Sequence, residues 1–258
     1  MSLQDLITVS PGTRKILAIT ISVAALAVLF AFFYYRGVNR SADPRVAEAR
    51  RYMSEYDRLA GGTDSYAWFH LLDSAGLVYR SIPGYRTSWE NGVIYNNKCS
   101  GLLLMALYDS TLAEPEKETL LELSVTYCDS SIAVYKQWLD EWGELPEEEV
   151  ARRVHDEMDE NDSAFAGLNF RKISGKRVSD IMLARIETPR RLSVSYSNKA
   201  TAYRHLMKQD SALVWYDRAL ALWKDNRTAE SNLSVLLGGE PVKPGIIKTL
   251  FPPDRKKR

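Results

Sequence analysis

The chain is poor in the residues on which metal centres and disulfide frameworks depend. Its 258 residues include only two cysteines and three histidines. Cys99 and Cys128 are too few for a disulfide framework and are not spaced as zinc ligands. His70 and Asp73 stand one helical turn apart, as metal ligands can, but a third ligand is missing. We therefore predict neither a metal site nor a cofactor.

Signatures of common enzymes are also missing. The sequence contains no H-E-x-x-H, P-loop or G-x-S-x-G motif. Residues 159–162 superficially resemble a calcium loop, but Ala164 occupies the position that requires glycine. The net charge is only +1, with acids and bases interspersed, so no field of one sign would collect nucleic acid. We expect a protein that is not an enzyme and does not bind nucleic acid.

Alternation of apolar and polar residues with a period of two is rare, whereas helical spacing of apolar residues is frequent. This pattern predicts an all-α fold. Residues 161–175 are expected to form an irregular connection in which Phe165, Leu168 and Phe170 tuck under the core. The predicted helices cover 43–60, 64–82, 88–109, 115–142 and 147–160, followed by one that ends at Pro189, two in 196–222 joined near 207–210, and one over 227–237.

Residues 16–35 contain no charged side chain. A helix of that length, at about 1.5 Å per residue, spans the roughly 30 Å hydrocarbon core of a bilayer. The alternative is a cleaved secretory signal, but the apolar run continues beyond residues 25–27, the only suitable cleavage site. We predict a transmembrane helix over 16–36 that contacts the lipid bilayer, a tail over 1–15 before it and a linker over 37–42 after it.

The orientation of this anchor is harder to derive, because basic residues flank both of its ends. The count slightly favours a cytoplasmic C-terminal domain. Long domains, however, translocate largely regardless of charge, and a short N-terminal tail is the easier one to leave inside. We therefore expect a single-pass membrane protein with an extracytoplasmic C-terminal domain. The flanking basic residues are Arg14 and Lys15 before the segment, and Arg36, Arg40, Arg45, Arg50 and Arg51 after it.

The two cysteines are placed symmetrically in the predicted hairpin of helices 88–109 and 115–142. Cys99 precedes the turn near Glu114 by 15 residues, and Cys128 follows it by 14. Two explanations remain open. Small buried side chains mark the close approach of two helices, the explanation that we favour. Alternatively, the pair forms a disulfide, which would require an oxidising compartment.

One helix–turn–helix unit has a recognisable spacing of small and aromatic residues, Ala200, Tyr203, Ala212, Tyr216 and Ala219. This spacing resembles the tetratricopeptide repeat, a 34-residue unit in which small residues let two helices approach and aromatics fill the space towards neighbouring units. Tyr196, Lys199 and Lys224 stand where that family prefers Trp, Leu and Pro.

An echo of this unit occurs earlier, where Tyr95, Asn97 and Lys98 repeat the spacing of Tyr196, Asn198 and Lys199. The resemblance implies antiparallel helical hairpins stacked as a divergent solenoid. It would cover residues 43–238, with the clearest repeat over 193–226, a capping helix over 227–237, and an extended proline-rich and basic tail over 239–258.

The resemblance also implies a function, because such repeats bind a peptide or a partner protein on their concave side. We predict a membrane-anchored scaffold for protein–protein interaction. Two alternatives are an envelope enzyme of the helical peptidoglycan-cleaving type, which needs a buried Glu of raised pKa, and a cytoplasm-facing adaptor. The predicted groove residues are Asn97, Lys98, Asn198, Lys199 and Tyr203.

Overall fold

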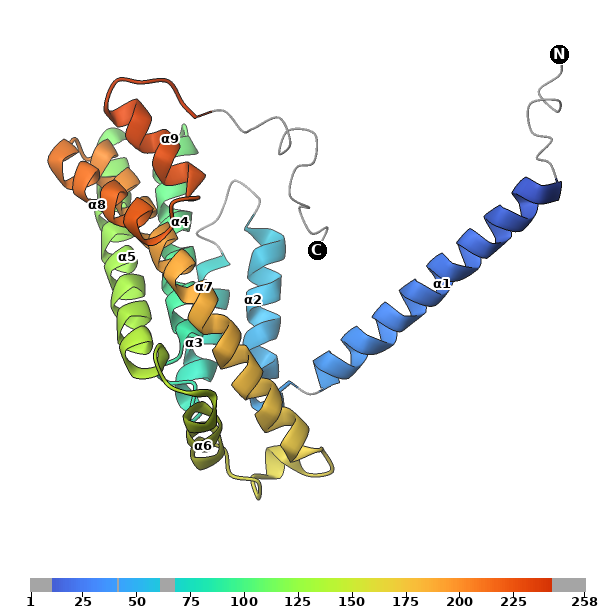
Figure 1. The fold of residues 1–258 in the computed structure, drawn as a ribbon. Coiled ribbons are helices and arrows are strands. Elements are labelled where there is room, and N and C mark those ends of the chain that lie inside the picture. Colours follow the sequence, from blue (N-terminus) through green and yellow to red (C-terminus); the bar gives the residue numbers. More distant parts are fainter. Residues whose placement is uncertain (1–10, 41, 61–67, 243–258) are drawn as a thin grey trace, which may run out of the picture. The chain divides into compact units, whose positions relative to one another are not determined.

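The computed structural model describes residues 11–40, 42–60 and 68–242, and these residues form helices and loops without a β-strand (Figure 1). The all-α prediction is confirmed for this part of the chain. The chain divides into two compact units, Met1–Ala42 and Asp43–Arg258, hereafter unit 1 and unit 2. Each unit is considered by itself.

In its described residues, unit 1 contains the helix α1, Pro11–Arg40. Its described side chains are uncharged from Ile16 to Ala31 and mostly exposed, a stretch of about 24 Å at 1.5 Å per residue. Over the described residues, no helix combines the length and apolar character needed to cross a membrane. The transmembrane helix predicted for 16–36 is therefore not confirmed. Most of the tail predicted over 1–15 lies outside the described residues.

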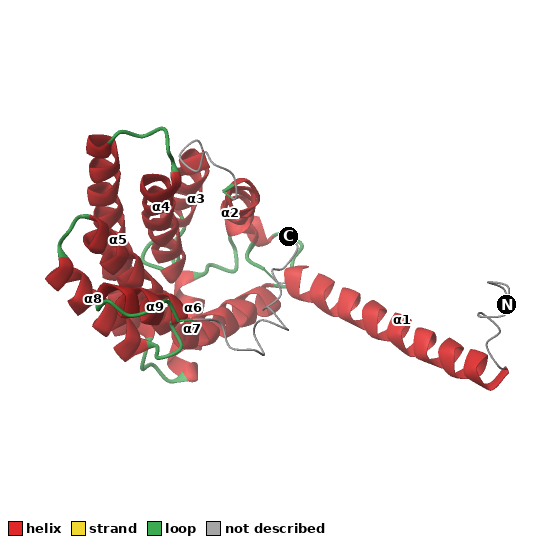
Figure 2. Ribbon diagram, turned by 90° about the horizontal axis from the view of Figure 1, so that it is seen from above, coloured by secondary structure: helices red, strands yellow, loops and turns green. Residues whose placement is uncertain are grey.

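Unit 2 is a set of helices in which most neighbours in sequence are also neighbours in space. Figure 2 shows α4 beside α3 and α5. The long helix α7 contacts α4, α5, α6, α8 and α9. In order, the elements are η1 (Pro44–Val46), α2 (Ala47–Leu59), α3 (Phe69–Ser81), α4 (Trp89–Tyr108), α5 (Glu114–Trp142), α6 (Glu147–Glu157), η3 (Ser163–Phe165), α7 (Phe170–His205), α8 (Gln209–Leu222) and α9 (Arg227–Leu236).

Among the described helices of unit 2, α4 and α5 share the most extensive contact. At the turn between them, a carboxylate oxygen of Glu116 accepts a hydrogen bond from the backbone N–H of Ala113, which fixes the start of α5. Farther along, Gly92 of α4 lies against the ring of Tyr135, where an added Cβ would be 2.4 Å from Cε1. Glycine is therefore required at this crossing. Both helices match their predicted bounds to within one residue.

The structure corrects the prediction that a helix ends at Pro189. Helix α7 runs through this proline as one 36-residue element. Proline removes one backbone hydrogen bond, but a helix packed on several sides tolerates that loss. On either side of Pro189, Thr188 and Leu192 are buried against neighbouring elements. The first helix of the predicted 193–226 repeat is thus the C-terminal part of a longer helix.

The connection between α6 and α7 also differs in part from expectation. Phe165 and Phe170 are buried, with ring centroids 5.3 Å apart. Leu168, predicted to join them, is 48% exposed. The reason is local, because Gly167 adopts a left-handed conformation (φ 72°) that turns the following residue outward.

At the end of unit 2, α9 confirms the predicted helix over 227–237. The side chain of Asn226 caps it by accepting a bond from Ala229 N–H. After Gly238, the chain turns back, so that Val242 N–H donates to the Ser231 hydroxyl. The predicted tail over 239–258 lies outside the described residues beyond position 242.

Candidate partner-binding face

The predicted groove residues lie on two helices, Asn97 and Lys98 on α4 and the other three on α7. Lys98 is only 5% exposed. Its ammonium group forms an ion pair with Asp73 of α3, the helix before it. It also lies 5.1 Å from the ring centroid of Tyr127 on α5, the helix after it.

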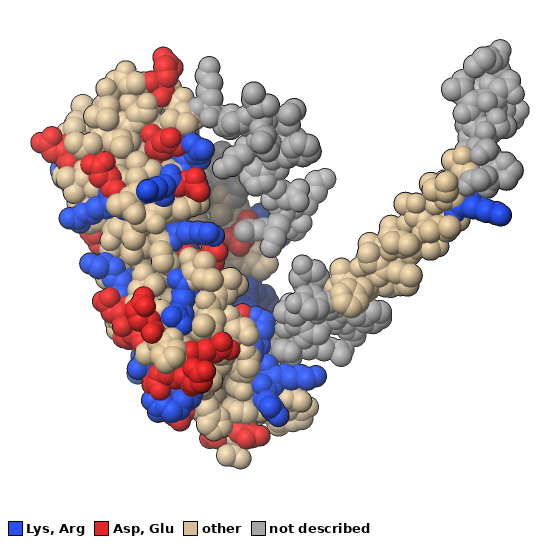
Figure 3. All heavy atoms as spheres, in the orientation of Figure 1, with Lys and Arg blue, Asp and Glu red and all other residues tan. Residues whose placement is uncertain are grey.

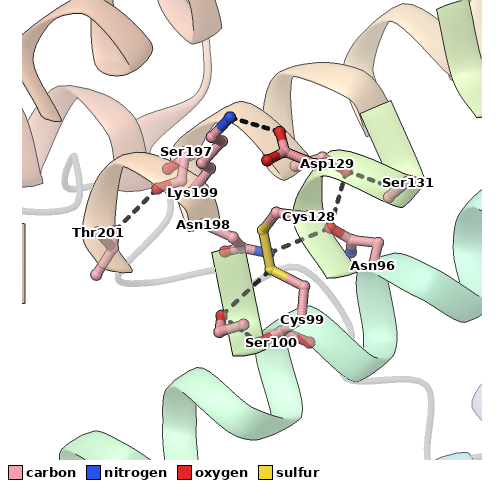
Figure 4. Close-up of a disulfide and its surroundings, with 12 residues drawn as sticks. Asn96, Cys99, Ser100, Cys128, Asp129, Ser131, Ser197, Asn198, Lys199 and Thr201 are labelled. Carbon is pink, nitrogen blue, oxygen red and sulfur yellow. Dashed lines mark hydrogen bonds and ion pairs between the residues drawn. A yellow bond between two sulfur atoms is a disulfide. The ribbon is translucent and has the colours of Figure 1, made fainter. Parts of the chain in front are cut away.

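Lys199 repeats this arrangement one hairpin later. It is also 5% exposed. It forms an ion pair with Asp129 of α5, a helix that comes earlier in the chain and packs against α7 (Figure 4). Its ammonium group lies 4.0 Å from the ring centroid of Trp215 on α8, the next helix. We call each set of a lysine, its aspartate and its aromatic a lysine clamp. The sequence echo between residues 95–98 and 196–199 therefore has a structural counterpart.

The lysine clamps engage both ammonium groups within the chain. Each ammonium group already has a counter-charge and an aromatic face within the chain, both favourable to a cation. The aspartates are the more accessible members, because their side chains are 60% exposed at Asp73 and 51% exposed at Asp129. The lysines thus link neighbouring helices within the chain. Sequence reasoning identified the lysines but missed both aspartates, since nothing local marks them.

Asparagine side chains connect the first helices of successive hairpins. The Oδ1 atom of Asn96 on α4 accepts a hydrogen bond from Asn198 Nδ2 at 3.2 Å (Figure 4). The same oxygen accepts a bond from the Ser195 hydroxyl at 2.9 Å. On the other side of α4, the hydroxyl of Tyr56 on α2 donates to the backbone oxygen of Asn97 at 3.4 Å. These bonds link α4 to α2 and to α7. Asn97, Asn198 and Tyr203 are each half-buried in this region.

The cysteines form a disulfide between α4 and α5, which corrects the packing explanation favoured from sequence. Cys99 and Cys128 are fully buried, and their Cα atoms are 5.2 Å apart. The Ser124 hydroxyl donates to the Cys99 backbone oxygen at 2.9 Å. Their equal distance from the turn predicted the contact but could not decide its chemistry, which also depends on the compartment. Figure 4 shows the disulfide beside the Lys199–Asp129 pair.

A second polar cluster bears on the enzyme alternative. Glu90 is largely buried but not isolated, because Arg177 Nη1 donates to its Oε1 at 2.8 Å. The guanidinium of Arg177 also lies 3.8 Å from the ring centroid of Tyr85 and 4.5 Å from that of Trp89. Burial alone would lower the pKa of Arg177, but Glu90 and Tyr85 outweigh it, so the guanidinium stays charged.

Glu157 comes closer to the carboxylic acid that such an enzyme needs. Burial raises the pKa of Glu157, although Arg177 and Arg153 oppose the shift. It is a half-buried residue beside Gly84, at the end of a short helix. A raised pKa alone does not define an active site, because structural ion-pair networks produce the same effect.

The charges on the described surface are mixed. In Figure 3, acidic and basic side chains intermingle on the visible face of unit 2. Across the described residues, no group of three or more His, Cys, Asp or Glu is arranged to hold a metal ion. The chain matches no protein-family model, no curated protein and no solved structure.

Proposed function

We propose that this chain is a membrane-tethered helical scaffold that binds a protein or peptide partner. The repeated lysine clamp is the main support for this proposal. The Lys98 clamp joins α3, α4 and α5, and the Lys199 clamp joins α5, α7 and α8 in the same way. Such a repetition is expected if one supersecondary unit is repeated and stacked. Buried Ala200 and Ala212 in one apolar cluster also support a tetratricopeptide-like unit over 193–226.

We place the partner face of this scaffold on α4 and α7, which contact each other. Its half-buried polar side chains are Asn97, Asn198 and Tyr203. Amide groups can bond peptide N–H and carbonyl groups, and tyrosine combines an apolar ring with a polar tip. A partner would therefore meet neutral hydrogen-bonding groups on this face, since the lysine charges are already matched within the chain.

The test is cross-linking and affinity capture of the full chain from membranes, with identification of the captured proteins. A variant with Asn97→Arg and Asn198→Arg introduces bulk and charge on the proposed face and should lose the partner set. Gln137→Arg, at an exposed position of α5, is the matched control and should keep it. Replacing Lys98 and Lys199 is less informative, because that change also breaks the clamps.

A folding control separates loss of binding from loss of fold. Circular dichroism and the unfolding midpoint must be unchanged in the double variant. If that folded variant captures the same partners as the native chain, the proposed face is wrong.

The tether is assigned to α1 and the scaffold to an extracytoplasmic location. The uncharged run over 16–35 supports the tether. The buried Cys99–Cys128 disulfide supports the location, because such bonds persist in oxidising compartments. Protease digestion of sealed cells or vesicles, followed by non-reducing electrophoresis, tests both together. Protection of unit 2 inside the cytoplasm, with free thiols, would instead favour the cytoplasm-facing adaptor.

A further inference from the structure

Helix α9 covers the C-terminal part of one face of α7. The side-chain nitrogen of Asn226, the residue that caps α9, donates to the Ser193 hydroxyl at 2.9 Å. Farther along both helices, the side-chain nitrogen of Asn232 donates to the Thr201 hydroxyl at 3.1 Å. The bonded residues advance in the same direction on both helices, so α9 runs parallel to this part of α7.

The same face of α7 continues before the start of α9 and is open there. Ile186 precedes Ser193 by seven residues and Leu183 precedes Thr201 by 18, which correspond to about two and five helical turns. Both side chains therefore lie on the face that α9 covers farther along, and they are 62% and 58% exposed. The other exposed residues of α7 between 175 and 190 follow the same helical spacing and are Gly175, Ser179 and Arg190.

The chain leaves α9 in the direction of this open face. The Gly239 N–H donates to the Ser234 backbone oxygen at 2.8 Å, and the Ser234 hydroxyl donates to the Glu240 backbone oxygen at 2.7 Å. Next, the Val242 N–H donates to the Ser231 hydroxyl at 3.2 Å, and Val242 is half-buried. Because the partners on α9 move back from 234 to 231, residues 239–242 run antiparallel to α9 and towards the lower-numbered residues of α7.

The sequence after Val242 has the length and the composition to cover the open face. Val242 stands near the level of Thr201, because Thr201 bonds to Asn232, the neighbour of the serine that Val242 contacts. From Thr201 back to Ile186 is roughly 22 Å at 1.5 Å per residue. The nine residues from Val242 to Phe251 extend to at most roughly 30 Å. The apolar residues of this segment recur at the spacing of one helical face and are Ile246, Ile247, Leu250 and Phe251.

We propose that residues 246–251 dock on α7 at Leu183 and Ile186 and so extend the cover that α9 begins. Apolar side chains on both sides of this contact are removed from water, which is the driving force for the docking. This segment is favoured over a second copy or a separate partner, because its link to Val242 keeps it at a high effective concentration beside the face. The contact depends neither on the tether nor on the partner face proposed above.

The test is cross-linking within the full chain. A variant with Ile186→Cys and Leu250→Cys is treated with a short bismaleimide, and the linked peptides are quantified by mass spectrometry. The native cysteines are paired and do not react. The matched control combines Leu250→Cys with Val214→Cys, which replaces a 48% exposed residue of α8, a helix that also packs against α9. We expect a several-fold higher yield for the link from 250 to 186 than for the link from 250 to 214.

Further substitutions test whether the contact is apolar. Adding Ile247→Asp and Phe251→Asp should reduce the yield of the 186–250 link to that of the control, whereas adding Lys248→Gln should leave it unchanged. Equal yields at 186 and 214, or a yield that survives the two aspartates, would overturn the docking. A link that joins two chains, seen as a covalent dimer, would overturn it as well and would assign the open face to a second copy. Circular dichroism of each variant confirms that the helices are intact.

Discussion

At the scale of single residues, the lysine clamps show how a nearly buried charge is accommodated at Lys199, where the tetratricopeptide pattern that residues 193–226 resemble has leucine. The lysine stem can fill the same apolar space, while its ammonium group finds Asp129 and the face of Trp215. Lys98 is accommodated by the same means. A charge is thus tolerated where the pattern expects an apolar side chain, because three helices supply its partners.

The clamp predicts a specific dependence on its acidic member. Asp129→Asn leaves the nearly buried Lys199 without a counter-charge, so the free energy of unfolding should fall by about 1–3 kcal/mol. Asp140→Asn, at an exposed position of the same helix, is the control and should change stability little. Urea unfolding of both variants measures the difference. Equal midpoints for the two variants would show that the clamp contributes nothing to stability.

Buried tyrosines predict how stability depends on alkaline pH. Burial raises the pKa of Tyr56 and of Tyr79 to about 12. Both groups therefore keep their protons longer in the folded chain than in the unfolded chain, where the pKa is about 10. Their contribution to stability is complete below pH 10 and is lost as the pH rises from 10 towards 12.

The measurement is the urea midpoint at pH 8, 10 and 11, which should fall across the two higher values. Tyr79→Phe keeps the ring and removes the titrating hydroxyl, so this variant should lose less stability over that interval. A midpoint that stays constant from pH 8 to 11 would contradict the burial of these hydroxyl groups.

At the scale of elements, α7 shows that a proline does not always end a helix. The sequence predicts a stop at Pro189, since proline lacks an N–H and crowds the preceding turn. In the structure, buried residues on both sides of Pro189 hold the helix together. Tertiary packing thus overrides a local preference.

This account predicts that Pro189→Ala stabilises the chain. Alanine restores the backbone N–H within a helix that is already formed, so the free energy of unfolding should rise by about 1–3 kcal/mol. The thermal unfolding midpoint measures the change, and Ser179→Ala on the exposed side of the same helix is the control. A lower midpoint for Pro189→Ala would mean that the proline itself is needed for the packing of α7.

The disulfide is the second feature at the scale of elements, because it links two helices. It closes a sequence separation of 29 residues between α4 and α5. By chain entropy, such a link stabilises the folded state by roughly 3–4 kcal/mol. Replacing both cysteines by alanine should lower the urea midpoint accordingly, and a reductant should lower the midpoint of the native chain but not of the variant. No response of the native chain to reduction would contradict the bond.

At the scale of the whole molecule, the helices were largely predictable from sequence and their contacts were not. The periodicity of apolar residues predicts the ends of α4, α5 and α9 to within one or two residues. One face of each helix must be buried, and the spacing of apolar residues shows which face it is. The candidate face itself stays a prediction. The sequence echo singled out Lys98, Asn198 and Lys199. Their partners lie on other helices, Asp73 for Lys98, Asn96 for Asn198 and Asp129 for Lys199.

The amino-acid sequence by itself determined that this chain is helical, where most helices begin and end, and that Cys99 and Cys128 meet. These properties depend on local periodicity and on equal distances from a turn. Only the tertiary structure decided that the lysines are held inside and that α7 passes through Pro189. Each of these outcomes depends on side chains brought together from distant parts of the chain, and local spacing carries no record of them.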